Sequence, residues 1–263
     1  MAHCGQSCRA NEFSPHQRAI CLASLSFEYA IARTSVMPVE YRTGNVSVKG
    51  RLEHFYDRFA LIYDTVAMEE TSIYKKILGR IDISANETAI DIGCGTGNIA
   101  MLLSPRFSKV TAIDLSSGML KKAQKKLDAQ GVRNVDLVKG DVLTHDFPES
   151  GFDCSFCVFI LHHLDPENEL IPLMEKTAAI TRNKIVVVDY KEKLTAWYRF
   201  FEWVEKSYVK QWLKLNPEQI WRRVNLRCTV EFDQTGYHVW ELEKRSSLQR
   251  YSTKSGSAEL DKA

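Results

Sequence analysis

The stretch Asp91-Ile-Gly-Cys-Gly-Thr-Gly97, read DIGCGTG, places three glycines at alternate positions shortly after an acidic residue. A glycine inside regular structure lowers stability, so this chain needs unusual backbone angles or a very close neighbour here. The loop follows a short β-rich apolar run, and a helix is expected from about Asn98. This order of strand, loop and helix predicts a ligand site at the carboxyl edge of an α/β sheet.

Strands and helices alternate from this loop toward the C-terminus. The strand candidates are TAIDIG (88–93), KVTAIDL (109–115), VDLVKGD (135–141), FDCSFCVFIL (152–161) and KIVVVDY (184–190). One helix is expected to open at Ser116, a good N-cap, and to end at Gly131, and another spans 166–180. Buried strands that alternate with helices predict a mainly parallel sheet covered on both faces.

The residues before the first strand divide into an extension and a helical entrance. Residues 1–47 show no clear period, and we expect a poorly ordered N-terminal extension, with Met37 as an alternative native start. An export signal within ICLASLSFEYAIA is less favoured, because Glu28 interrupts the apolar segment. From residue 48 onward, apolar and aromatic residues recur at helical spacing, and TSIYKKILGRI continues as a second helix.

The C-terminal part of the chain has a different pattern. Aromatic residues between 196 and 215 line one side of an expected helix, opposite lysine and arginine, which indicates a lid over a ligand pocket. The basic face would also suit peripheral contact with an anionic membrane surface. CTVEFD and YHVWELEKR, joined by a turn at 234–236, predict a β-hairpin, and residues 246–263 form a polar tail. The expected folded domain is therefore 48–245.

Composition argues against several classes of protein. The 263 residues carry a formal net charge of +2, which is too small to indicate a nucleic-acid partner. No uncharged apolar run reaches the roughly 18 residues of a membrane-spanning helix, so we expect a cytoplasmic protein. Seven cysteines in a chain of this length do not suggest a disulfide framework.

Some of the cysteines could in principle bind a metal. Cys154 and Cys157 form a C-x-x-C within an expected buried strand, where residues three apart point to opposite faces and cannot share a metal. The N-terminal candidates match no familiar zinc spacing; they are Cys4, Cys8, His16 and Cys21. We therefore expect no metal site.

DIGCGTG resembles motif I of the class I methyltransferases, E/D-x-G-x-G-x-G, which use S-adenosylmethionine (SAM) as methyl donor. FDCSFCVFILHHL is similar to that family's F-D-x-V-x-x-x-x-x-L-H-H-L pattern, and DRFALIYD resembles the entrance helix of the ubiquinone/menaquinone biosynthesis group. The resemblance covers about residues 52–190. It implies a Rossmann-like, doubly wound sheet of seven strands, mostly parallel with an antiparallel last strand.

Two residues of the loop region separate SAM from a dinucleotide. Asp91 at the strand end would favour a ligand with a positive amino group over a diphosphate. Asn98 departs from the dinucleotide pattern G-x-G-x-x-G, so an NAD-dependent oxidoreductase is the less favoured alternative.

The resemblance implies cofactor contacts at the ends of four strands. The glycine loop would approach the methionine part of SAM, Asp114 would bind the ribose hydroxyls, and Asp141 would lie near the adenine. The alternatives are a helix cap for Asp114, a surface turn for Asp141 and simple helix packing for Tyr63. The expected cofactor-binding residues are Asp91, Gly93, Cys94, Gly95, Gly97, Asp114, Leu115, Asp141, Val142, Val158 and Tyr63.

Methyl transfer requires a base only when the acceptor arrives protonated. His162 and His163, at the mouth of the fourth strand, are the candidate bases, and the alternative is that they only structure the loop. The chain has ILHHL where enzymes that methylate amino groups of nucleic-acid bases carry [D/N]-P-P-[Y/F/W]. We therefore expect transfer to O, N or C of a small molecule, quinone- or lipid-like. A cofactor-binding regulatory or assembly protein without turnover is the alternative function.

Overall fold

The computed structural model describes residues 50, 53, 56, 57, 60, 70–84, 86–191, 209–234 and 237–245. The predicted extension at 1–47, Tyr63, residues 196–208 of the predicted lid helix and the tail at 246–263 lie outside the described residues. The domain limits 48 and 245 therefore stay a prediction.

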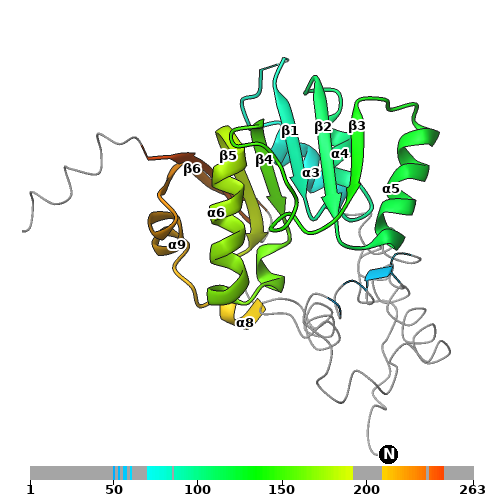
Figure 1. The fold of residues 1–263 in the computed structure, drawn as a ribbon. Helices are drawn as coiled ribbons and strands as arrows, with labels where there is room; N and C mark the ends of the chain where they lie inside the picture. Colours follow the sequence, from blue (N-terminus) through cyan, green and yellow to red (C-terminus); the bar gives the residue numbers. More distant parts are fainter. Residues whose placement is uncertain are drawn as a thin grey trace, which may run out of the picture.

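Seven strands form one sheet in the order β3-β2-β1-β4-β5-β7-β6 (Figure 1). Their bounds are β1 Thr88–Ile92, β2 Lys109–Asp114, β3 Val135–Lys139, β4 Phe152–Val158, β5 Thr181–Tyr190, β6 Leu226–Gln234 and β7 Tyr237–Lys244. The first five strands pair in parallel, and β7 runs antiparallel to both β5 and β6. The predicted fold class and hairpin are confirmed. The strand order reverses between β1 and β4, and such a reversal opens a crevice for a ligand at the carboxyl ends of the strands.

Helices cover both faces of this sheet, with α6 on one face and α3 and α4 on the other (Figure 1). Their bounds are α3 Glu70–Leu78, α4 Asn98–Leu103, α5 Ser117–Ala129, α6 Ile171–Ile180, α8 Val209–Trp212 and α9 Pro217–Arg223. The predicted cap of α5 is confirmed, since Ser116 Oγ accepts a hydrogen bond from Met119 N at 3.0 Å. Among the described helices, none has the length and apolarity needed to cross a bilayer.

Two apolar clusters lie on opposite faces of the sheet, because successive side chains of a strand alternate. In β5, Val187 belongs to one cluster and Val186 to the other. Burial of each such side chain stabilises the fold by about 1.5–3 kcal/mol. Cys154 and Cys157 fall into different clusters in the same way, and both are buried free thiols, so the prediction that they cannot share a metal is confirmed.

Two predicted boundaries are wrong. The fourth strand ends at Val158 rather than at 161, because Phe159 takes a left-handed φ of 54° and the chain enters a 3-10 turn at Leu161–His163. Helix α8 ends at Trp212 rather than at 215. Asn216 caps a separate helix, α9, which was not predicted, and Pro217 disfavours helical angles in the residue before it.

A further difference lies before α6. The sequence predicts one helix over 166–180, whereas the chain makes a π-helical turn at Pro166–Leu170 and then α6. Asp165 caps the turn, and its side chain accepts from Glu167 N and Asn168 N. The turn lies directly after the histidine pair and continues into α6.

Candidate active site

The three glycines of the loop all have left-handed backbone angles, with φ of 70° at Gly93, 54° at Gly95 and 78° at Gly97. A Cβ on Gly93 would lie 2.6 Å from Ile160 Cδ1, and one on Gly97 would lie 2.9 Å from Ala123 Cβ. A Cβ on Gly95 would meet no heavy atom within 4 Å. Gly93 and Gly97 therefore make room for neighbouring side chains, whereas Gly95 leaves open space in front of its backbone.

Neighbouring elements hold the loop in place. Gly93 N donates a hydrogen bond to Ile113 O, in the adjacent strand β2, at 2.9 Å. From α5, Lys126 Nζ donates to Thr96 Oγ1 and to Asn98 Oδ1, both at 2.8 Å. The sequence indicated only a lysine face on α5, with no signal that one lysine reaches back to the loop. A loop fixed by a strand and a helix is pre-organised for a ligand.

Asp91, at the end of β1, is a buried acid with an unsatisfied oxygen. The residue is 1% exposed, and its Oδ2 has no hydrogen-bond partner in the described part of the chain. Burial raises the pKa of Asp91 from 3.8 to about 7, and the nearby Asp114 adds to the rise. A buried carboxylate oxygen without a partner is costly, so this position favours a ligand that brings a positive charge.

Asp114 ends β2 and faces the same loop. Its Oδ2 accepts from Gly95 N at 2.8 Å, and its Oδ1 accepts from Ser116 N at 2.8 Å. Burial raises the pKa of Asp114 despite these two hydrogen bonds. Each carboxylate oxygen keeps a second lone pair, so Asp114 can still accept hydrogen bonds from two hydroxyl groups. The cap of α5 is made by Ser116, so the alternative of Asp114 as the N-cap does not apply.

Cys94 lies between these two acids in the loop. Its side chain is buried, and burial together with Asp91 and Asp114 raises the pKa of the Cys94 thiol well above its usual value. A thiol that stays protonated is a poor nucleophile. The Cys94 thiol is therefore poorly suited to act as a nucleophile.

Asp57 is a site residue that the sequence reasoning missed. Its Oδ1 accepts from Gly118 N at 2.7 Å and from Ser116 Oγ at 2.6 Å, at the N-terminus of α5. An acid at this end of a helix interacts favourably with the helix dipole. Asp57 is the first residue of DRFALIYD, the segment that resembles the family's entrance helix. The contact predicted from that segment was Tyr63, which lies outside the described residues. Asp57 joins the entrance segment to the start of α5, whose cap Ser116 lies two residues after Asp114.

The remaining predicted contacts follow β3 and β4. Asp141 Oδ1 accepts from Leu143 N at 3.0 Å, so this acid also orders its own turn. Val142 is buried, while Leu115 and Val158 are half-buried. These residues stand at the carboxyl ends of β2, β3 and β4, as the sequence predicts for a nucleoside site. Their cofactor contacts themselves stay predictions.

His162 is paired with a buried acid. Its Nδ1 lies 2.8 Å from Asp189 Oδ1, and Asp189 also accepts from Leu161 N at 3.1 Å. Because a carboxylate only accepts, the hydrogen of this contact belongs to Nδ1, which leaves Nε2 as the ring nitrogen that can exchange a proton. Sequence reasoning missed Asp189; an acid near the end of the buried strand KIVVVDY was the signal available.

His163 has a different environment. Its Nε2 lies 3.0 Å from Tyr56 Oη of the entrance segment, and its ring centroid is 4.0 Å from that of His162. Burial, together with the neighbouring His162, lowers the pKa of His163 well below its usual value. His163 is therefore neutral near neutral pH, and its hydrogen bond ties the entrance segment to the mouth of β4.

Comparison with known proteins agrees with this geometry. The family model described as a methyltransferase domain matches residues 89–184, which contain the glycine loop and the ends of β2, β3 and β4. Residues 89–184 of the chain are therefore similar to a methyltransferase domain.

Relatives of this region are distant. A demethylmenaquinone methyltransferase of Geobacillus stearothermophilus is 32% identical over 82 residues, which are 30% of this chain and 35% of that protein. The match thus spans about a third of that relative's length.

Two solved structures show the same fold at low identity. Magnesium protoporphyrin IX methyltransferase from Synechocystis PCC 6803 with bound SAM has a TM-score of 0.58 at 15% identity, over 77% of this chain and 99% of that one. The [4+2]-cyclase SpnF has a TM-score of 0.59 at 12% identity, over 76% of this chain and 96% of that one. Since one of the two is called a cyclase, the shared fold does not by itself determine the reaction.

The charges and hydrogen-bonding groups of the site residues are suited to bind SAM. The unsatisfied Asp91 carboxylate suits the ammonium group of an amino acid, and the open space at Gly95 admits a ligand against the backbone. Asp114 offers two oxygens to a ribose diol. No group of three or more metal-ligating side chains is found among the described residues.

Proposed function

We propose that the protein transfers a methyl group from SAM to O, N or C of a small-molecule acceptor. The observation that carries this proposal is the buried Asp91 carboxylate, whose Oδ2 has no described partner, beside the open space at Gly95. A neutral or anionic ligand would leave that carboxylate uncompensated, whereas the amino-acid part of SAM supplies an ammonium group.

The chain's own residues would bind and align the reactants. Bound SAM supplies an activated methyl group on a sulfonium, so positioning and exclusion of water are the main tasks left to the protein. We assign the ammonium group to Asp91, the ribose hydroxyls to Asp114, and the adenine to Asp141 and Val142. The half-buried Val158, at the end of β4, would lie under the methyl group.

For an acceptor that arrives as a hydroxyl, we assign the base to His162. Asp189 holds the Nδ1–H of His162, so Nε2 can accept the proton that leaves the acceptor oxygen as its bond to carbon forms. His163 would act as a positioning residue, since its Nε2 is already engaged by Tyr56. The pairing with Asp189 is the reason to prefer His162 over His163.

The finer part of the proposal concerns the acceptor and its location. The name of the Geobacillus relative supports a quinone-like acceptor, and the basic, aromatic pattern of 196–215 supports a lipid-like one. We propose a cytoplasmic enzyme that meets such an acceptor at an anionic membrane surface. Sedimentation with anionic vesicles checks the surface contact, and protein that stays in the supernatant would rule it out.

Calorimetric titration with S-adenosylhomocysteine and with NAD tests the nucleoside site. We expect binding of the first and none of the second, and the reverse would overturn the proposal. A screen of a metabolite pool with labelled SAM then tests turnover. Binding without turnover of any pool would favour the alternative of a cofactor-binding protein that has lost catalysis.

A further inference from the structure

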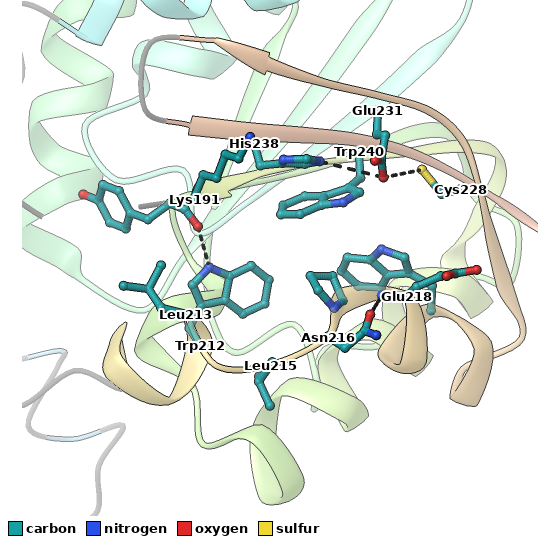
Figure 2. Close-up of a pocket in the computed structure, with 13 residues that line it drawn as sticks. Lys191, Trp212, Leu213, Leu215, Asn216, Glu218, Cys228, Glu231, His238 and Trp240 are labelled. Carbon is teal, nitrogen blue, oxygen red and sulfur yellow. Dashed lines mark hydrogen bonds and ion pairs between the residues drawn. The ribbon is translucent and has the colours of Figure 1, made fainter. Parts of the chain in front are cut away.

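A cavity of about 360 Å³ lies outside the nucleoside site, between the β6–β7 hairpin, the end of β5 and helices α8 and α9 (Figure 2). Its wall includes three tryptophans, Trp212, Trp221 and Trp240, and contains none of the glycine-loop residues. Figure 2 shows His238 and Trp240 on the hairpin side and Trp212 facing them from α8. Its volume is in the range of sites for small molecules.

The aromatic wall is arranged around Trp240. Its ring centroid lies 6.0 Å from that of Trp212, 5.9 Å from that of Trp221 and 4.2 Å from that of His238. All three tryptophans are less than 9% exposed, so the hairpin and the two helices hold their rings in place. Fixed aromatic rings are suited to a flat, apolar body.

Trp221 is a lining residue that carries an unused hydrogen-bond donor. The residue is 1% exposed, and its Nε1 has no hydrogen-bond partner among the described residues. By contrast, Trp212 Nε1 donates to Tyr190 O at 3.0 Å. An indole N–H only donates, so the group missing at Trp221 is an acceptor, which excludes a cation as its partner.

His238 brings a second unused polar atom. Its Nδ1 lies 2.7 Å from Asp233 Oδ1, and a hydrogen bond from Lys191 lowers the pKa of Asp233, so that carboxylate is ionised and only accepts. The hydrogen of this contact therefore belongs to Nδ1, which leaves Nε2 as the second ring nitrogen that needs a partner. Nε2 is buried and makes no hydrogen bond in the described part of the chain, and the Glu231 carboxylate oxygen, at 3.8 Å, is beyond hydrogen-bond distance.

Other polar groups of the wall already have partners within the protein. Asn216 Oδ1 accepts from Glu218 N at 3.1 Å as the cap of α9, and Glu218 Oε1 accepts from Arg222 Nη2 at 2.6 Å. Among the described lining residues, the buried polar atoms without a hydrogen-bond partner are thus Trp221 Nε1, which needs an acceptor, and His238 Nε2.

We propose that this cavity is a second small-molecule site, which binds a flat aromatic ring system that carries hydroxyl groups. The ring packs against the tryptophans, an oxygen accepts from Trp221 Nε1–H, and a hydroxyl donates to His238 Nε2. The site is chemically separate from the SAM niche, since it offers a donor and an acceptor in place of buried carboxylates. It does not depend on methyl transfer.

The proposal is tested with naphthol as probe and naphthalene, which has the same ring system without the hydroxyl, as its control. Proton–nitrogen spectra of the five tryptophan side chains report each indole N–H, and the signal absent from Trp221→Phe identifies Trp221. We expect naphthol to shift the Trp221 signal downfield and to bind roughly tenfold or more tightly than naphthalene, because its hydroxyl oxygen accepts from Trp221 Nε1–H. No movement of the Trp221 signal, or equal affinity for the two probes, would overturn the proposal.

Two matched variants separate polar recognition from loss of ring area. Trp221→Phe removes the unused N–H and should reduce the preference for naphthol over naphthalene roughly tenfold. Trp212→Phe removes an N–H that already donates to Tyr190 O, so it should reduce the affinity for both probes by the same factor. Gly95→Ala should leave naphthol binding unchanged. If Trp221→Phe kept the full preference, or if Gly95→Ala abolished naphthol binding, the site would lie elsewhere.

Discussion

At the glycine loop, the ligand space is made by backbone within one short segment, whereas at the tryptophan cavity it is made by side chains from Tyr190 to Trp240. The loop has an open position at Gly95 and an uncompensated negative charge at Asp91. The cavity is lined by aromatic rings that include an indole N–H and an imidazole nitrogen without hydrogen-bond partners in the described chain. The same sheet thus provides one site suited to a cationic nucleoside and another suited to a neutral aromatic, and substitutions in one should leave the other intact.

The largest expected effect lies at the histidine pair next to the nucleoside site. His162→Asn keeps a side-chain N–H for Asp189 but removes Nε2, so turnover of a hydroxyl acceptor should fall roughly 10²–10⁴-fold. The fall should appear in kcat, with S-adenosylhomocysteine affinity and naphthol binding unchanged.

His163→Asn is the matched control for that variant. It removes the contact with Tyr56, so it should affect KM more than kcat. Equal loss of kcat in the two variants would show that the Asp189 pairing does not select the base.

The next effect tests the open position in the loop. Gly95→Ala places a methyl group where the ligand approaches, and we expect calorimetry to show S-adenosylhomocysteine affinity reduced on the order of 100-fold, as for removal of a well-placed contact. Gly131, at the end of α5, also has a left-handed φ, and a Cβ added there would likewise meet no heavy atom within 4 Å.

Gly131→Ala is therefore a control for backbone strain alone. Both alanine variants should lose about 1–2 kcal/mol of unfolding free energy in urea titrations. Only Gly95→Ala should lose affinity, and equal affinities in the two variants would contradict a ligand at Gly95.

Measurements of stability across a pH series test the ionisation of Asp91. Its pKa of about 7 in the folded chain lies above its ordinary value of 3.8, so the protein binds an extra proton when folded between these values. The stability linked to this group is complete at low pH and is lost as pH rises through about 7, by roughly 1.4 kcal/mol for each unit. Asp91→Asn should flatten this part of the curve of Tm against pH.

Ligand affinity should change in the opposite direction. The ionised carboxylate binds the ammonium group, so affinity for S-adenosylhomocysteine should rise roughly tenfold from about pH 6 to about pH 8. In Asp91→Asn it should be lower and independent of pH over this range. A wild-type affinity that fell with rising pH would exclude the proposed contact.

The smallest expected effect is a difference in unfolding free energy between variants of two tryptophans of the cavity. Trp212→Phe loses the hydrogen bond to Tyr190 O, whereas Trp221→Phe loses no hydrogen bond within the described chain. Denaturant titrations should therefore show that Trp212→Phe is the less stable variant by about 1 kcal/mol. The opposite order would mean that Trp221 Nε1 is satisfied inside the protein.

Local pattern was enough to predict the strands, the glycine loop and the Ser116 cap, because each depends on neighbouring residues and on burial. Local pattern failed where a few turn or cap residues interrupt an element that the longer hydrophobic pattern predicts to continue. Phe159 ends β4 in a left-handed turn, and Asn216 with Pro217 starts a helix inside an otherwise continuous aromatic pattern. Neither of these two breaks is visible in the hydrophobic periodicity from which the strands and helices were predicted.

The sequence alone determined that a strand, a bare loop and three successive strand ends bring acids to one edge of a parallel sheet, because parallel strands align their carboxyl ends. Only the tertiary structure showed that Asp189 pairs with His162, that Asp57 reaches the start of α5, and that two polar atoms in a tryptophan cavity lack partners within the described chain. These contacts join residues far apart in the chain. Their distances depend on how helices and the hairpin pack, and no local preference encodes that packing.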